Sequence, residues 1–182
     1  MGIPLASNGF LTQFCTVQIT HHFRTARMKR IALHLLPCIL LGACLTSPKD
    51  CEANPSNPAT ETFATSLGVD LNAMQKTALG DYTQDLVVGT GDVLSTLQIV
   101  TIHYSAFLTN GTLIDQVTDQ PFPIDLSSRA TIGLADGMLG MNVGGKRRIV
   151  VPSELGLGAC PNGAIPGNST LIYEVELLSI SG

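Results

Sequence analysis

The clearest pattern along the chain is an apolar side chain at every second residue. It runs through residues 98–108, recurs in residues 120–126, and is most regular in residues 170–180. A period of two indicates β-strands that turn one face toward a core. Residues 146–151 also predict a strand, which ends at Pro152 because proline has no N–H to donate to a sheet.

Turn signals separate these strands. The pair Asn110-Gly111 follows the first strand directly and is the strongest short hairpin signal, so residues 112–115 are expected to begin a return strand. Glycine and proline crowd residues 156–167, and this stretch is therefore expected to form a long loop before the last strand.

Residues 132–139 change the period to that of a helix. Leu134, Met138 and Met141 follow one another at the spacing i, i+4, i+7, which makes one helical stripe. Glycines interrupt this stretch, and each costs about 1 kcal/mol against alanine, so the helix must be held by packing on the sheet. The order of elements predicts an α+β domain. We expect a curved antiparallel sheet of about five to six strands wrapped around one short α-helix.

The first part of the chain has the pattern of a secretory signal. Residues 28–30 are Met-Lys-Arg, residues 31–42 are uncharged and mostly apolar, and residues 41–44 are Leu-Gly-Ala-Cys. This ending resembles a bacterial lipobox. The resemblance implies that residues 28–43 are a lipoprotein signal peptide and that a lipid on Cys44 anchors the protein to a membrane of the cell envelope. The alternative is an ordinary cleaved signal with an incidental cysteine.

This signal sets the expected domain organisation. Because a signal begins near the start of a protein, residues 1–27 are interpreted as an over-extended start without structure. Residues 44–80, rich in Pro, Ser, Thr and Asn at their beginning, are expected to be a solvated tether, and residues 81–182 to be the folded domain. Leu45, where an Asp often signals retention in the inner membrane, favours the outer membrane if the source is Gram-negative.

Composition and charge narrow the classes of function. With 45% hydrophobic and 13% charged residues, the chain can bury a core. Residues 44–182 carry 14 Asp and Glu against 6 Lys and Arg, which argues against nucleic-acid binding because that needs a basic face. His21 and His22 are adjacent and have no further ligands nearby, so we expect no metal site and no cofactor.

Short motifs follow one another along the chain. They are 85–91 (DLVVGTG), 100–104 (VTIHY), 110–115 (NGTLID), 121–122 (PF), 137–148 (GMLGMNVGGKRR), 151–158 (VPSELGLG) and 165–178 (IPGNSTLIYEVELL). Their order and spacing resemble the FKBP family of peptidyl-prolyl cis-trans isomerases. The resemblance covers about residues 82–181. It implies the FKBP-like fold, isomerase activity that assists protein folding, proline-containing extended polypeptides as partners, and a monomer.

The implied chemistry needs no nucleophile and no metal. Rotation about an X-Pro bond meets a barrier of about 20 kcal/mol because amide resonance must break. A dry pocket that favours the twisted, less polar amide lowers this barrier. The expected site is therefore aromatic and apolar, with few polar groups.

The resemblance carries the site over residue by residue. The catalytic positions that keep the expected chemistry are Tyr104, Asp115, Phe122 and Tyr173. The substrate-binding positions are Ile114, Ala130, Thr131, Leu134, Leu157 and Ile165. Of these, Leu134 stands where the family has a Trp at the pocket floor, and Leu157 stands where it has a Tyr.

These departures leave alternatives open. A pocket without the Trp and the Tyr has less apolar area and one hydroxyl fewer, so catalysis is expected to be weak. The first alternative is a non-catalytic FKBP-like module that binds extended peptides. Another is a β-rich adhesion or assembly lipoprotein, which a sheet without a helix behind it would favour.

Two cysteines remain outside the signal and its flanks. Cys51 lies in the expected tether and Cys160 in the long glycine-rich loop. In an oxidising compartment they can pair and close part of the pocket rim, but the sequence does not give their distance, so pairing stays open.

Overall fold

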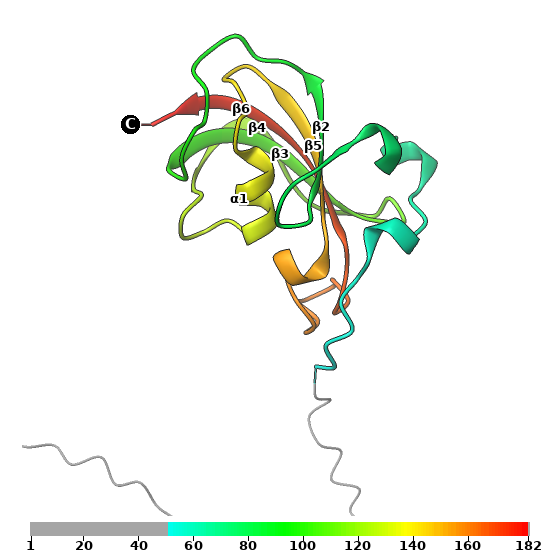
Figure 1. Ribbon diagram of the computed structural model, residues 1–182. Helices are drawn as coiled ribbons and strands as arrows, with labels where there is room; N and C mark the ends of the chain where they lie inside the picture. The colour runs from blue at the N-terminus through cyan, green and yellow to red at the C-terminus, as the bar shows by residue number, and fades with distance from the viewer. Residues whose placement is uncertain (1–50, 182) are drawn as a thin grey trace, which may run out of the picture. The chain divides into compact units, whose positions relative to one another are not determined.

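The computed structural model describes residues 51–181, and its centre is an antiparallel sheet with one α-helix on one face (Figure 1). The strands are β1 (Gln75–Lys76), β2 (Tyr82–Val87), β3 (Ile99–Leu108), β4 (Leu113–Asp125), β5 (Lys146–Val151) and β6 (Leu171–Ile180). The helix is α1 (Ile132–Met138), and four short 3-10 helices are η1 (Pro58–Thr60), η2 (Thr65–Leu67), η3 (Leu71–Ala73) and η4 (Ser153–Leu155). The sheet has six strands in the order β1-β2-β5-β6-β3-β4, which confirms the predicted α+β architecture.

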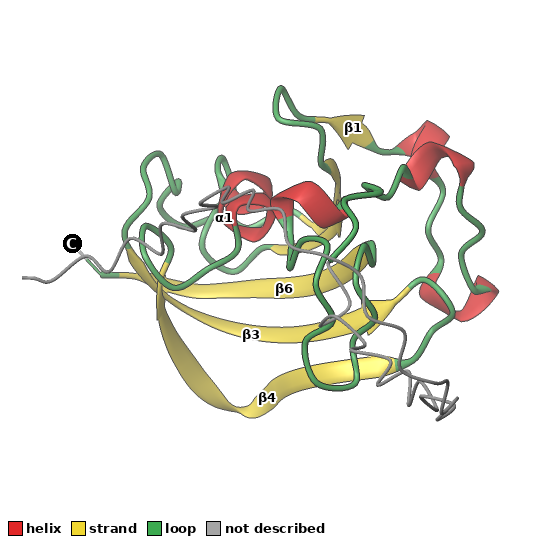
Figure 2. Cartoon of the chain, turned by 90° about the horizontal axis from the view of Figure 1, so that it is seen from below, coloured by secondary structure: helices red, strands yellow, loops and turns green. Residues whose placement is uncertain are grey.

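Strand β4 joins two segments that the sequence pattern presented separately. It is bent along its length (Figure 2), and its register with β3 shifts within the bend. Phe122 pairs with Ile102, whereas Val117 pairs with Tyr104, so extra residues bulge out of β4 between these two pairs. The bulge brings Phe122 and Asp115, which are separated in sequence, to the same part of β3.

Helix α1 lies against β5 because two of its residues have no side chain. A Cβ at Gly133 would overlap Val151, and a Cβ at Gly137 would overlap Ile149. The hydroxyl of Thr131 caps the helix by accepting the Leu134 N–H at 3.3 Å. The glycines that weaken the helix in isolation thus permit its contact with the sheet.

The opposite face of the sheet is covered by residues that precede the expected domain. Leu67 and Met74 are buried against Val150 and Ile172, which point away from α1. Partly buried apolar residues between 63 and 82 complete this second cluster. We find no helix within residues 51–181 that is long and apolar enough to cross a membrane.

This packing changes the expected organisation of residues 44–80. From residue 51 onward the segment is folded against the domain rather than extended in solvent, because strands with apolar residues on both faces need a cover on each side. Residues 44–50, the signal at 28–43 and residues 1–27 lie outside the described residues.

Asp81 is the one acidic side chain that the structure buries fully among the described residues. Neither carboxyl oxygen has a hydrogen-bond partner there, and Asp136 in α1 lies close enough to repel it. Burial, with a smaller contribution from Asp136, raises the pKa of Asp81 to about 7. The group is therefore neutral in the folded protein at pH values where it ionises in the unfolded chain.

The raised pKa of Asp81 predicts that the stability of the protein depends on pH. Because the pKa of Asp81 is about 7 in the folded state and 3.8 for an ordinary, solvated aspartate, the free energy of unfolding falls as pH rises from about 4 to 7. One pKa unit corresponds to about 1.4 kcal/mol, so the loss is at most about 4 kcal/mol. Urea unfolding at several pH values should show this decline in the wild type and a much flatter profile in Asp81→Asn. Asp92→Asn, at an exposed site, should keep the wild-type profile; equal profiles for all three proteins would contradict the assignment.

Candidate functional site

One cavity collects all ten catalytic and substrate-binding residues that the sequence predicts, whereas Cys44, the predicted lipid site, lies outside the described residues. The cavity has a volume of about 270 Å³ and lies between α1, the strands β3, β4 and β6, and the loop after η4. The predicted residues that line it are Tyr104, Ile114, Asp115, Phe122, Ala130, Thr131, Leu134, Leu157, Ile165 and Tyr173. Their individual roles stay predictions, but their common location follows from the fold.

A polar pair stands in the wall of this cavity. The hydroxyl of Tyr104 on β3 donates a hydrogen bond of 2.6 Å to Oδ2 of Asp115 on β4. Burial raises the pKa of Tyr104 well above its usual range, and the bond to the Asp115 carboxylate adds to this effect. The phenol therefore stays protonated and fixes the carboxylate in one orientation.

Aromatic rings form the rest of that wall. The rings of Tyr104 and Phe122 have centroids 5.8 Å apart and planes tilted by 58°. Phe122 is 37% exposed, so it stands at the mouth, whereas Tyr173 is 8% exposed and belongs also to the core. Burial raises the pKa of the Tyr173 hydroxyl too. Together these rings give an apolar group, such as a proline ring, flat surfaces to contact.

The start of α1 supplies the inner end of the cavity. Leu134 is buried there, in line with its predicted place at the floor. Within residues 51–181 the backbone N–H of Thr131 has no hydrogen-bond acceptor, while its hydroxyl is occupied by the helix cap. This N–H can therefore bind a carbonyl oxygen that enters the cavity.

The loop between η4 and β6 forms the remaining side. Leu157, Asn162 and Ile165 line the cavity from this loop. Asn162 and Ile165 exchange two backbone hydrogen bonds of 3.0 Å, which close a tight turn. Cys160 in the same loop forms a disulfide with Cys51, which decides the question that the sequence left open.

Sequence reasoning missed several residues that line the cavity. Ile102, Ala106 and Ile124 lie in the same alternating rows as predicted site residues, so the period of two carried a signal for them. Arg129 and Asn162 lie in loops, where no periodicity indicates which side chain faces inward.

A larger cavity of about 620 Å³ lies beside β1 and β2 and is a weaker candidate. Two cations line it. Arg147 pairs with Asp85 at 2.6 Å and donates to the carbonyl oxygens of Gly137 and Leu139, and Lys76 lies over the Tyr82 ring at 5.2 Å from its centroid. The charged side chains of this cavity thus already have partners within the protein, which leaves them less able to bind a ligand. No cluster of three or more potential metal ligands occurs in the described part of the chain.

The family model described as FKBP-type peptidyl-prolyl cis-trans isomerase matches residues 91–178. An FK506-binding protein of Neisseria meningitidis serogroup B is 43% identical over 101 residues, which cover 53% of this chain and 93% of the relative. A photosynthetic NDH subunit of lumenal location from Arabidopsis thaliana is 36% identical over 111 residues, covering 53% of this chain and 51% of that protein.

Solved structures show the same similarity. The crystal structure of a peptidyl-prolyl cis-trans isomerase from Pseudomonas syringae pv. tomato superposes with a TM-score of 0.56 at 30% identity, over 60% of this chain and 82% of that one. FkpA from Escherichia coli gives a TM-score of 0.54 at 28% identity, over 60% of this chain and 52% of FkpA. The observed fold is therefore the FKBP-like fold that the motifs implied.

The Tyr104–Asp115 pair generates a prediction about titration. Asp115→Asn removes the negative charge and the strong acceptor, so the pKa of Tyr104 should fall while burial, its largest cause, still keeps it above the ordinary value. NMR of ring-labelled tyrosine during an alkaline titration measures this shift. Asp119→Asn, at an exposed site on the same strand, should leave the Tyr104 pKa as it is. A pKa that is unchanged in Asp115→Asn would show that the hydrogen bond does not form in solution.

Proposed function

The chain belongs to the FKBP-type peptidyl-prolyl cis-trans isomerase family, and from this premise we propose that its 270 Å³ cavity twists X-Pro amides of unfolded or extended polypeptides. The observation that carries the proposal is the arrangement of one polar pair and several rings around a single apolar cavity. The biological role that follows is assistance of protein folding.

The proposed mechanism depends on desolvation and on a few oriented contacts. Amide resonance gives an X-Pro bond a barrier of about 20 kcal/mol, and the twisted amide is less polar than the planar one. An apolar cavity therefore favours the twisted state over the planar state. Phe122 and Tyr173 hold the proline ring, and the Thr131 N–H holds a substrate carbonyl. Tyr104 and Asp115 supply a hydrogen-bonded polar pair in the wall.

The floor of the cavity favours weak activity and supports a second candidate function. Leu134 and Leu157 offer less contact area than the aromatic residues of the family pattern, so less binding free energy distinguishes the twisted amide from the planar one. If that difference is too small, the same cavity functions as a peptide-binding module without catalysis.

Restoring the two aromatic side chains tests the proposal. In a protease-coupled assay on a proline peptide, Leu134→Trp with Leu157→Tyr should raise kcat/KM about tenfold, the equivalent of about 1.4 kcal/mol. Ile132→Trp is the matched control, because Ile132 is on the same helix but 60% exposed and outside the cavity; it should match the wild type. Wild-type turnover equal to the uncatalysed rate at high protein concentration would reject the isomerase function and favour the binding module.

We also propose that the protein is held in the cell envelope by a lipid on Cys44. The basic and apolar residues before Cys44 support this, and so does the disulfide between Cys51 and Cys160, because disulfides persist in oxidising compartments. Only residues 45–50 would then separate the lipid from the disulfide. At no more than about 3.3–3.6 Å per residue, six residues can span at most roughly 20 Å, so a lipid on Cys44 would keep the domain close to the membrane surface.

Metabolic labelling tests the anchor. When cells that express the full chain are grown with labelled palmitate, the wild-type protein should carry the label and the Cys44→Ser variant should not. Cys38→Ser is the control, because Cys38 lies in the expected signal and should leave labelling intact. Equal labelling of wild type and Cys44→Ser would refute the lipid attachment and leave the ordinary cleaved signal.

A further inference from the structure

We propose that residues 51–61 form a strap that positions the substrate-binding loop, residues 153–170, and so completes the cavity from outside the matched isomerase domain. The strap precedes residues 91–178, the part of the chain that the family model covers. The inference rests on the proposed isomerase function of the cavity, because it assigns a positioning role for the same reaction.

The loop needs such a restraint. It supplies Leu157, Asn162 and Ile165 to the cavity, yet it contains no strand and only the short helix η4. Gly158 and Gly163 have positive φ. Between residues 158 and 168 the internal backbone bonds are the Asn162–Ile165 turn and one bond from the Asn168 N–H to the Gly158 carbonyl oxygen at 2.9 Å. A loop of this kind orders its side chains only where something outside it fixes the backbone.

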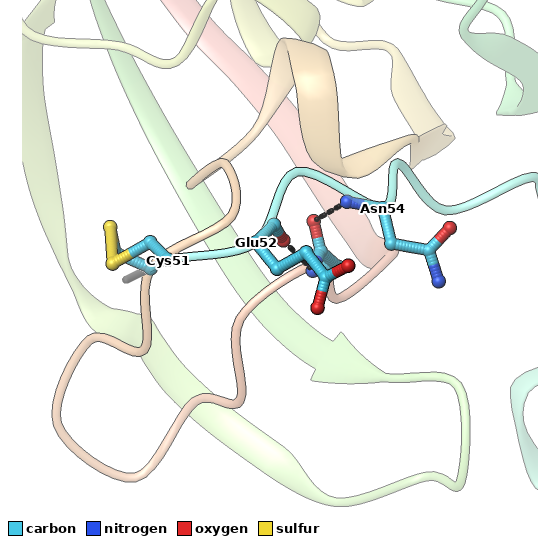
Figure 3. The surroundings of a disulfide bond; sticks show 5 residues. Cys51, Glu52 and Asn54 are labelled. Carbon is cyan, nitrogen blue, oxygen red and sulfur yellow. Dashed lines mark hydrogen bonds between the residues drawn. A yellow bond between two sulfur atoms is a disulfide. The ribbon is translucent and has the colours of Figure 1, made fainter. Parts of the chain in front are cut away.

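The first point of attachment is covalent and lies in the middle of the loop. Cys51 is joined to Cys160, with Cα atoms 4.9 Å apart and a sequence separation of 109. Figure 3 shows the start of the strap running beside this loop. Cys160 lies in sequence between Leu157 and Asn162, which both line the cavity, so the disulfide limits the movement of that wall.

The second attachment is near the end of the loop. Asn168 has a left-handed backbone with φ of 58°, and its side-chain amide bonds twice to the strap. Its Nδ2 donates to the carbonyl oxygen of Glu52 at 3.0 Å, and its Oδ1 accepts the N–H of Asn54 at 3.3 Å (Figure 3). One side chain of the loop thus forms hydrogen bonds with two backbone groups of the strap.

The third attachment joins both ends of the loop through Ser56. Ser56 and Ser153 exchange two bonds, each N–H donating to the other hydroxyl, at 2.9 and 2.7 Å. The Thr170 hydroxyl lies 2.8 Å from the Ser56 hydroxyl and donates to the Glu61 carboxylate at 3.0 Å. Ser153 and Thr170 are buried, so these polar groups depend on the strap for their partners.

Loss of the strap should affect substrate binding more than turnover. Tyr104, Asp115, Phe122 and Tyr173 lie on β3, β4 and β6, where sheet hydrogen bonds hold them independently of the loop. Leu157 and Ile165 have no such support. A protein whose binding-competent loop is populated only part of the time has an apparent affinity reduced by that fraction, so KM should rise while kcat changes little.

The experiment compares variants of the full chain at a temperature far below unfolding. We expect Cys51→Ser with Cys160→Ser to raise KM for a proline peptide about fivefold, and Asn168→Gly about twofold, with kcat changed less than about twofold. Glycine keeps the left-handed backbone at 168 while removing the amide. Asn57→Ala is the control, since Asn57 caps η1 within the strap and makes no side-chain bond to the loop among the described residues; its KM should equal that of the wild type.

Two further measurements separate positioning from general destabilisation. Dithiothreitol transfers two electrons and two protons to the disulfide and becomes its own cyclic disulfide, so it should raise KM of the wild type but not of the double Ser variant. Amide hydrogen exchange should accelerate in residues 157–168 of the reduced protein and stay slow in β3 and β6.

Unchanged KM and unchanged loop exchange after the disulfide is opened would overturn the proposal. So would a fall in kcat at constant KM, because that would place the effect in the sheet. If neither the wild type nor any variant turns over substrate, the isomerase function fails. The strap is then tested by the affinity for a fluorescent proline peptide and by amide hydrogen exchange in the loop. If both stay unchanged when the disulfide is reduced, the strap proposal is rejected.

Discussion

The structure depends on one constraint, which is that β5 and β6 carry apolar side chains on both faces. Ile149 and Tyr173 point toward α1, whereas their neighbours Val150 and Ile172 point to the other side. Each face left in water would forfeit about 25 cal/mol per Å² of apolar surface. The sheet therefore needs two covers, and only the helix side is supplied by the matched isomerase domain. The second cover comes from residues 63–82, which precede that domain. The strap, residues 51–61, comes just before this cover in the chain and binds the loop of residues 153–170.

The cavity is a consequence of how little of the first face α1 covers. The helix is short and sits against β5 through Gly133 and Gly137, so the half of the face near β4 stays open. Strand β4 is bent (Figure 2), and its residues Phe122 and Asp115 line that opening. The proposed isomerisation of an amide depends on an apolar space with few polar contacts and on no reactive group, and the open part of this face would supply that space.

Sequence alone was enough to predict the helix and strands β3 to β6, because each rests on a period or on an ordered motif. The ten residues predicted for the pocket line one cavity, and their roles stay predictions. Sequence reasoning failed where contacts decide the structure. The β4 bulge leaves no trace in an alternating pattern, and the 3-10 helices η1 and η2 are too short to show a period. Residues 45–66 have the composition of a linker, yet from residue 51 onward the chain packs on the domain. Leu67, Met74 and their apolar neighbours dock it because Val150 and Ile172 offer an apolar surface on the sheet.

The reduced floor of the cavity and the strap are connected through the free energy of binding. Leu134 and Leu157 contribute less contact area than aromatic side chains would, so each substrate gains less free energy on entering. The entropy lost in ordering a mobile loop would then take a larger share of that gain. A loop fixed in advance at Cys160 and Asn168 removes much of this cost before the substrate arrives. A pocket with small side chains therefore depends more on a pre-ordered wall than a pocket lined by large rings does.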